Sequence, residues 1–367
     1  MRGRLGLVAV AVLALIGALW WWLSARGESV PVAEASAEAD AGPAANPAAG
    51  GRLEAMRARA AKAGDGGVGL TEALPPGVVA TFGWGNGAGK LGRNRPEEAN
   101  PEAPMSLSRD GQGNTWVLDQ VNGRMVKLDK DGKVVAEMPL PLQTPQDMAV
   151  TKDGTAAVLD RLVDKAVALL GPDGKQVGEL KLLGKGLEEG GQVTGVFADG
   201  DDVYVEREHG DLVKLGDSKG KPDPERPEVP GRPTRDGLSY ISANISDPAA
   251  GRVAVTSIDR ASRQHRFTRE VPLGAPILAL MLLDSDRSGV IYLAGVVQLP
   301  QPTGEPMPRM AVLCLDPLDG RPIGSAVLPA NTDADETFRE LTVLAEGGVL
   351  FLHRTEERAE LMRADCR

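Results

Sequence analysis

Short apolar runs rich in Val, Leu and Ile recur from Gly77 to the C-terminus, and Gly, Asp, Asn and Pro separate them. Examples are VVATF, TWVLD, RMVKLD, AAVLD, VYVER and GVLFLH. Runs of this length, bounded by turn-forming residues, are typical of β-strands, and no stretch in this region keeps a helical period. The pattern predicts an all-β fold for residues 77–367.

The apolar runs belong to a unit that repeats with an offset of 41 to 42 residues. Pro104 aligns with Pro145 at the smaller offset, and Asp131 aligns with Asp173 at the larger one. Four weaker copies begin at Val193, Ser239, Ile277 and Arg339. Each unit has room for four short strands, and a period of about 40 residues with four strands is typical of a β-propeller. The sequence therefore predicts a six-bladed β-propeller.

The last unit has material for only three strands before the chain ends at Arg367. The run from Val78 to Trp84 precedes the first unit and has no partner within it. Since a four-stranded blade covers its faces only with neighbouring blades, the ring has to close. We expect residues 78–84 to supply the fourth strand of the last blade.

Polar residues cluster where the chain reverses between two strands of the first unit. Asp119, Asn122 and Arg124 lie within six residues there, and Asp160 and Lys165 repeat the pattern in the second unit. Asp and Asn bind backbone N–H groups at turns, whereas an active site needs one unique set of residues. We interpret the five residues as structural, with Arg124 pairing either with Asp119 across the hairpin or with the neighbouring blade.

The same stretch resembles the NHL-repeat pattern. The matching positions are the Phe-Gly-x-Gly lead-in from Phe82, Gly113-Asn114, Trp116-Val117, Asp119, Asn122, Arg124 and Asp131-Gly132. The match is good in the first unit, fair in the second, and rests on periodicity alone from Val193 onward. The resemblance implies a propeller that serves as an interaction platform. Some members of that family bind RNA through basic faces, and related propellers include lyases and lactonases.

The N-terminus carries an uncharged apolar run of 19 residues, Leu5–Leu23. This length spans a hydrocarbon core of roughly 30 Å, and the Arg residues before the run place residues 1–4 in the cytoplasm by the positive-inside rule. Three Trp residues close the run, where a cleaved signal peptide would carry small residues. We predict a single-pass inner-membrane anchor over residues 5–23 with the rest of the chain in the periplasm. The alternative is a cleaved signal peptide and an exported protein.

Residues 24–76 are expected to link the anchor to the propeller. Ser29–Gly51 consists mainly of Ala, Pro, Gly and Glu, and this composition predicts a flexible tether because it offers little to bury. Residues 52–63 (RLEAMRARAAKA) favour a helix, although a helix of about a dozen residues is marginal in isolation.

The formal net charge of −10 argues against nucleic-acid binding, which requires clustered Lys and Arg. Three His and two Cys form no Cys-x-x-Cys or His-Glu-x-x-His pattern, so we expect no metal motif and no cofactor. The segment GWGNGAGKLG fits a nucleotide-binding glycine pattern only formally, because a Pro-rich stretch follows it instead of a helix.

A few single residues remain as candidates. Asp147, Asp199 and Asn244 lie near the beginnings of units, where lactonase-type propellers place metal ligands, but no motif selects them. His209 is expected in an exposed turn. Cys314 and Cys366 fall in neighbouring units, and an exported location permits a disulfide if their Cα atoms lie within about 7 Å.

Two Pro-rich segments, Lys219–Pro233 and Leu299–Pro308, are too polar to be buried, and they are either insertions at blade edges or loops that dock a partner. Together the observations favour a non-catalytic envelope protein whose propeller binds a protein or a cell-envelope polymer. The alternative is a metal-dependent hydrolase of the gluconolactonase-like propeller class, with a metal in the central channel.

Overall fold

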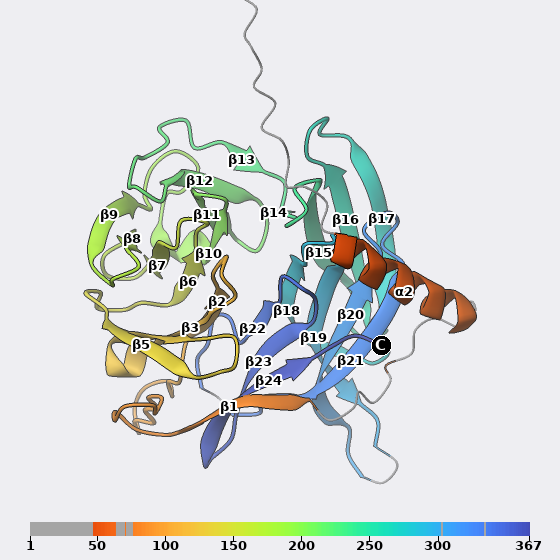
Figure 1. Ribbon diagram of the computed structural model, residues 1–367, viewed down its shortest axis with the longest axis horizontal. Coiled ribbons are helices and arrows are strands. Elements are labelled where there is room, and N and C mark those ends of the chain that lie inside the picture. The colour runs from red at the N-terminus through yellow and green to blue at the C-terminus, as the bar shows by residue number, and fades with distance from the viewer. Residues whose placement is uncertain (1–46, 64–69, 71–75, 302–303, 334) are drawn as a thin grey trace, which may run out of the picture. The chain divides into compact units, whose positions relative to one another are not determined.

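Six four-stranded sheets surround a central axis in the computed structural model (Figure 1). The structure describes residues 47–63, 70, 76–301, 304–333 and 335–367. Neighbouring strands within each sheet are antiparallel, and consecutive strands pair with one another. The predicted six-bladed all-β propeller is therefore confirmed.

The strands of the first three blades follow the repeat. Blade one contains β2 (Ser106–Arg109), β3 (Thr115–Asp119), β4 (Arg124–Leu128) and β5 (Val134–Pro139). Blade two contains β6 (Asp147–Val150), β7 (Ala156–Asp160), β8 (Ala166–Leu170) and β9 (Gln176–Lys181). Blade three contains β10 (Val193–Asp199), β11 (Asp202–Arg207), β12 (Leu212–Asp217) and β13 (Glu228–Val229).

The last three blades have longer central strands. Blade four contains β14 (Arg232–Pro233), β15 (Ser239–Asp247), β16 (Arg252–Asp259) and β17 (His265–Pro272). Blade five contains β18 (Ile277–Ser285), β19 (Ile291–Leu299), β20 (Met307–Leu315) and β21 (Pro322–Pro329). Blade six contains β22 (Leu341–Val343), β23 (Val349–Arg354), β24 (Arg358–Ala364) and β1 (Gly77–Gly83).

Burial explains why the central apolar runs are continuous rather than alternating. Every residue of β3 and β7 is buried, because neighbouring blades cover both faces of these strands. The outer strands β5 and β9 each bury only one of their six residues. Strand position within the blade therefore sets the hydrophobic pattern.

The ring closes through the last blade, as the strand count predicts. β1 runs antiparallel to β24, and its register pairs Gly77 with Arg363 and Gly83 with Arg358. The N-terminal end of the propeller thus supplies the outer strand of a blade whose other three strands come from the C-terminus. Separation of the two ends would open the ring.

For the end of the Pro-rich segment Lys219–Pro233, the expectation of an insertion or a loop is wrong. This part of the segment contains the outer strand of blade three and the inner strand of blade four, β13 and β14. Each of these strands has only two residues, and Pro233 pairs with Tyr240 of β15. Because such short pairs carry no hydrophobic period, the sequence pattern does not reveal them.

Helix α2 (Pro47–Ala63) lies against β21 of blade five (Figure 1). Met56 on the helix is fully buried, and Leu53 and Ala60 pack beside it on the same face. Arg57 donates to both carboxylate oxygens of Asp316, at 2.7 and 2.9 Å. The helix that is marginal in isolation is thus held by packing against the propeller.

The predicted anchor over residues 5–23 lies outside the described residues, as do residues 1–4 and 24–46. Among the helices that the structure does describe, none has the length and apolar character needed to cross a membrane.

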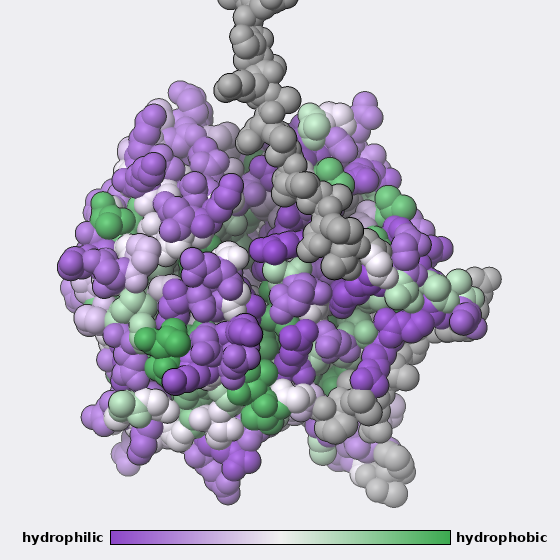
Figure 2. Space-filling view, viewed as in Figure 1, coloured by the Kyte–Doolittle hydropathy of each residue, from purple (hydrophilic) through white to green (hydrophobic). Residues whose placement is uncertain are grey.

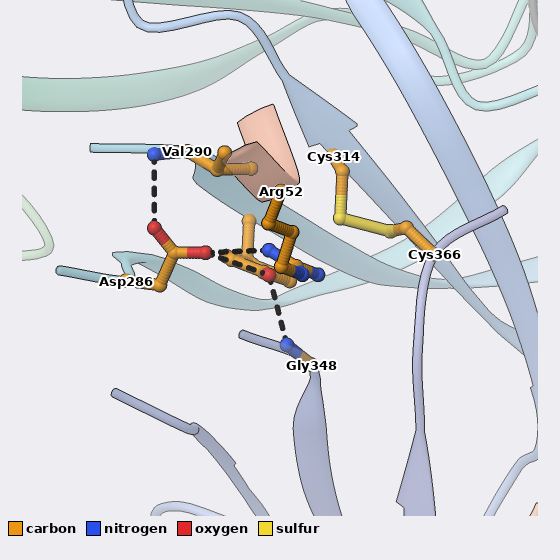
Figure 3. The surroundings of a disulfide bond; sticks show 7 residues. Arg52, Asp286, Val290, Cys314, Gly348 and Cys366 are labelled. Atoms are coloured by element: carbon orange, nitrogen blue, oxygen red, sulfur yellow. Dashed lines mark hydrogen bonds and ion pairs between the residues drawn. A yellow bond between two sulfur atoms is a disulfide. The ribbon is translucent and has the colours of Figure 1, made fainter. Parts of the chain in front are cut away.

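Cys314 of β20 and Cys366, just after β24, form a disulfide with their Cα atoms 6.2 Å apart (Figure 3). Beside it, Asp286 accepts hydrogen bonds from Arg52 of α2 at 2.8 Å and from the Tyr292 hydroxyl at 3.0 Å. Burial raises the pKa of Asp286, whereas a hydrogen bond from its neighbour Ser288 and the charge of Arg52 oppose that rise. Helix α2 and the C-terminal end of the chain are therefore both attached to blade five in the same region.

We expect the double substitution Cys314→Ala/Cys366→Ala to lower the free energy of unfolding by about 2–4 kcal/mol, because the disulfide closes a loop of 52 residues. Urea unfolding under non-reducing conditions measures the loss. Reduced wild-type protein should unfold at the same urea concentration as the variant. Two free thiols in the unreduced wild-type protein would contradict this pairing.

Met56→Ala should lower the free energy of unfolding by about 2–5 kcal/mol, since it leaves a cavity between α2 and blade five. Met307→Ala is the matched control, because the Met307 side chain is 42% exposed and its loss leaves no cavity. Equal midpoints for the two variants in urea unfolding would show that α2 is not held on the propeller.

Candidate functional site

The polar cluster of blade one fastens a loop to the blade. The buried carboxylate of Asp119 accepts from the backbone N–H of Gly92 at 2.8 Å, from the Asn122 amide at 2.9 Å and from Arg124 Nε at 2.9 Å. Arg124 also donates to the carbonyl of Lys90 at 2.6 Å. The cluster thus pins the Gly-rich segment after β1 onto blade one.

The second blade repeats the carboxylate but not the basic residue. Asp160 accepts from the Thr144 hydroxyl at 2.7 Å and from the backbone N–H of Val163 at 2.9 Å. Lys165 has a left-handed backbone, with φ 49°, and its carbonyl accepts from Leu182 N–H just as the carbonyl of Gly123 accepts from Leu140 N–H. Lys165 therefore corresponds to Gly123, and no ion pair joins it to Asp160 within the described contacts.

Asp147 joins several blades at the central channel. Its carboxylate accepts from Ser106 Oγ of β2 at 2.6 Å and from the backbone N–H of Val196 in β10 at 2.9 Å. Arg339, which precedes β22, donates to the same carboxylate at 2.7 Å and to the Val196 carbonyl at 2.9 Å. One ion pair, with Asp147 buried and Arg339 partly exposed, thus connects blades one, two, three and six.

Two of the three residues considered as metal ligands are engaged by arginines. Asp147 is paired with Arg339, Asp199 is paired with Arg260, and Asn244 is exposed in the middle of β15. Within the part of the chain that the structure describes, no group of three or more His, Cys, Asp and Glu side chains could hold a metal ion. A metal at Asp147 would first have to displace the Arg339 guanidinium.

Cationic and aromatic side chains line the channel beside this pair. The guanidinium groups of Arg232 and Arg339 lie 4.2 and 4.6 Å from the centroid of the Phe197 ring. The channel therefore carries positive charge beside an aromatic face, with Arg339 paired to Asp147.

A pocket of about 370 Å³ opens beside the channel where blades three, four and five meet. Its apolar wall includes Ile241 and Ala243 of β15, Leu280 and Leu282 of β18, and Phe338. Figure 2 shows that the drawn face of the molecule is mostly hydrophilic, with small separate apolar patches. A concave site with an apolar wall is the ordinary form of a binding site on such a surface.

The polar side of the pocket is built around Glu206 at the end of β11. Its carboxylate accepts from Thr194 Oγ1 at 2.8 Å and from Arg232 Nη2 at 3.3 Å, and His209 Nδ1 lies 3.6 Å away. The Glu206 side chain is 10% exposed and the His209 side chain is 82% exposed. Glu206 is thus held by the protein, and His209 is free to meet a ligand at the rim.

The turn that carries His209 is strained. Glu208 and His209 both have left-handed backbones, with φ 51° and 58°, which costs a non-Gly residue on the order of 1–2 kcal/mol. A bond from Gly210 N–H to the Arg207 carbonyl closes the turn, and His209 N–H donates to Thr194 Oγ1 at 3.0 Å. Strain of this kind, kept at the rim of a pocket, favours a functional interpretation.

The sequence predicts His209 in an exposed turn, and the structure has it there. The pocket around His209 is not predicted by the sequence. Turns of this type usually carry Asn-Gly, so a Glu-His pair gives no signal for the left-handed backbone. Arg232 is hidden in the Pro-rich segment, and Arg339 lies in a connection between blades. Their meeting around Phe197 depends on the curvature of the ring.

Comparisons with known proteins add similar structures and no family. No family model matches the chain, and no curated protein matches it. A streptogramin B lyase is 10% identical with a TM-score of 0.40, over 74% of this chain and 97% of its own. BamB from Moraxella catarrhalis is 11% identical with a TM-score of 0.35, over 81% of this chain and 100% of its own.

Hydrazine synthase from Kuenenia stuttgartiensis is 14% identical with a TM-score of 0.45, over 71% of this chain and 78% of its own. At these identities and scores the likenesses carry no argument about function. The fold assignment rests on the strand pairing of this chain, and the NHL-repeat resemblance stays a prediction.

Asp147→Ala should lower the free energy of unfolding by about 3–5 kcal/mol, because it leaves the Arg339 guanidinium buried without its partner. Asp202→Ala is the matched control; it removes the partner of Lys214 at the surface, where the Asp202 side chain is 40% exposed, and should cost less than about 1 kcal/mol. Chemical unfolding of both variants measures the difference. Similar small losses would contradict the role of Asp147 in joining the blades.

Proposed function

We propose that this protein is a non-catalytic binding scaffold of the cell envelope, whose propeller recognises a partner protein. The observation that carries the proposal is the pocket between blades three, four and five. It combines an apolar wall with fixed polar groups and an exposed histidine on a strained turn. These features suit recognition of another molecule better than a reaction, since Glu206 is already paired with Arg232.

The channel chemistry also supports a scaffold over the alternative of a metal-dependent lactonase. The carboxylate placed best for a metal, that of Asp147, is occupied by Ser106, Val196 and Arg339. Metal analysis of the purified chain separates the two functions. A stoichiometric divalent ion together with lactone hydrolysis would favour the lactonase.

The proposal places the propeller in the periplasm, held by the predicted anchor over residues 5–23. The supporting observations are the apolar run itself and the disulfide Cys314–Cys366, a bond that forms and persists in oxidising compartments. We propose no nucleic-acid partner, because the net charge of −10 opposes binding to phosphates. A protein or cell-envelope polymer fits this location.

Ser242→Trp should abolish capture of the partner, because Ser242 lines the pocket and the indole would fill it. The test compares full-length wild-type and variant chains as baits in cross-linked envelope membranes. Ser262→Trp is the matched control, since Ser262 is exposed in the turn between β16 and β17 of the same blade.

Three outcomes are informative. Loss of the captured protein with Ser242→Trp alone supports the pocket as the binding surface. Retention by both variants rules the pocket out. Failure of the wild-type chain to capture anything reproducibly would count against the scaffold itself.

A further inference from the structure

Blade four has an inner strand much shorter than the strand beside it. β14 has two residues and β15 has nine, and their register pairs only Arg232 with Ile241 and Pro233 with Tyr240. In blades one and two the inner strand has four residues and its neighbour five. The inner edge of β15 beyond Ile241 therefore has no strand beside it in the described structure.

The short connection from blade three causes this gap. Only Pro230 and Gly231 separate β13 from β14, so the chain passes directly from the outer edge of one blade to the inner edge of the next. Gly231 turns sharply, with φ 111°, and a Cβ there would lie 2.4 Å from the Ile241 carbonyl oxygen. The chain has no spare length with which to continue β14 along β15.

Hydrogen-bonding groups on this edge are left open. The backbone N–H of Arg260, just after β16, donates to the carbonyl of Leu238, just before β15. Because hydrogen-bonded pairs alternate along an antiparallel ladder, the even-numbered residues of β15 direct their N–H and C=O groups to β16. The odd-numbered residues direct their backbone N–H and C=O groups to the inner edge of the sheet, where the Ser239 carbonyl accepts from the Thr234 N–H. The N–H and C=O groups of Ala243 and Ile245 thus point into the gap, and the described hydrogen bonds include none from them to another strand.

The gap coincides with the pocket and has an apolar lining. Ser242 and Ala243 of β15 face Leu280 and Met281 of β18 across it. The apolar surface continues outward, because Ile245 is 40% exposed and Leu278 is 54% exposed. Side chains of alternate residues on an added strand would meet this surface, since a strand directs every second side chain to one face.

We propose that an extended segment of a partner protein enters the pocket and pairs with the inner edge of β15, completing the inner strand that blade four lacks. This rests on the proposed scaffold function and specifies how its partner binds. The main-chain bonds to Ala243 and Ile245 supply affinity, and the wall of Leu280, Met281 and Phe338 selects apolar side chains. Unpaired strand edges are templates for this kind of addition.

The chemistry of the pocket favours a neutral or mixed peptide over a charged ligand. Glu206 and Arg232 neutralise each other at the polar end, and Arg232 is also fixed by a 2.6 Å bond to the Leu283 carbonyl. At the rim, the imidazole of His209 is 82% exposed, and its Nδ1 lies 3.6 Å from the Glu206 carboxylate. An apolar segment with one hydrogen-bonding residue near His209 matches this arrangement.

A displayed library of random short peptides, selected on the full-length chain, is the probe. We expect the chain to select segments with alternating apolar residues. A selected peptide should slow hydrogen exchange at the amides of Ala243 and Ile245, which have no strand beside them among the described residues. The amides of Ser242 and Asn244 should change little because they are already bonded to β16.

Ala243→Pro should weaken binding of the selected peptide by about tenfold or more, because it removes an inward N–H and places a ring in the path of the added strand. Thr268→Pro is the matched control. The same alternation directs its N–H to the outer edge of β17 in the same blade, so peptide binding should be unchanged. Thermal unfolding of both variants shows whether each is folded, and the exchange measurement on wild-type protein needs no variant.

The outcomes separate this proposal from the scaffold function. Unchanged peptide affinity in Ala243→Pro, or selection of no peptide, overturns the strand addition. If the wild-type chain still captures an envelope protein that Ser242→Trp loses, the scaffold stands without it. Concentration-dependent dimers that Ala243→Pro abolishes would assign the edge to a second copy of this chain. Exposure of the two amides on deletion of residues 24–46 would assign it to the chain's own linker.

Discussion

Closure of the ring is the constraint on which the rest of the structure depends. A single blade leaves both faces of its central strands uncovered, and these strands are buried at nearly every position. The pairing of β1 with β24 supplies the missing contact between the two ends of the propeller. The disulfide and helix α2 reinforce the same region, where Cys366 and Arg52 both reach blade five or its turns. The N-terminal and C-terminal parts therefore stabilise each other.

A second constraint acts at the centre, where the inner strands meet. Polar groups there cannot reach bulk water easily, so each needs a partner within the protein. Asp147 meets this need with Arg339, and Phe197 lies beneath the guanidinium groups of Arg339 and Arg232. These contacts use the channel for structure. The larger pocket of about 370 Å³ lies beside the channel, where the inner strand of blade four ends early.

Much of the fold follows from local sequence. The apolar runs, the turn residues and the offset of 41 to 42 residues predict six blades and the closing strand, because each blade repeats the same local constraints. The alignment of the first two units pairs Lys165 with Arg124, but the structure places Lys165 where the first unit has Gly123. The second unit has one inserted residue in this turn, and the sequence repeat does not indicate which residue adopts the left-handed backbone. The two-residue strands β13 and β14 are also beyond sequence patterns, because they are too short to show a period.

The sequence by itself determined the class of fold, the number of blades, the two cysteines that fall in neighbouring units and an apolar N-terminal run suited to a membrane. These features depend on composition and spacing within a few dozen residues. Only the tertiary structure decided that α2 docks on blade five, that Asp147 pairs with Arg339, and that the described part of the chain places no strand along the inner edge of β15 beyond Ile241. Each of these contacts joins residues far apart in the chain, and their distance is set by the curvature of the closed ring rather than by any local pattern.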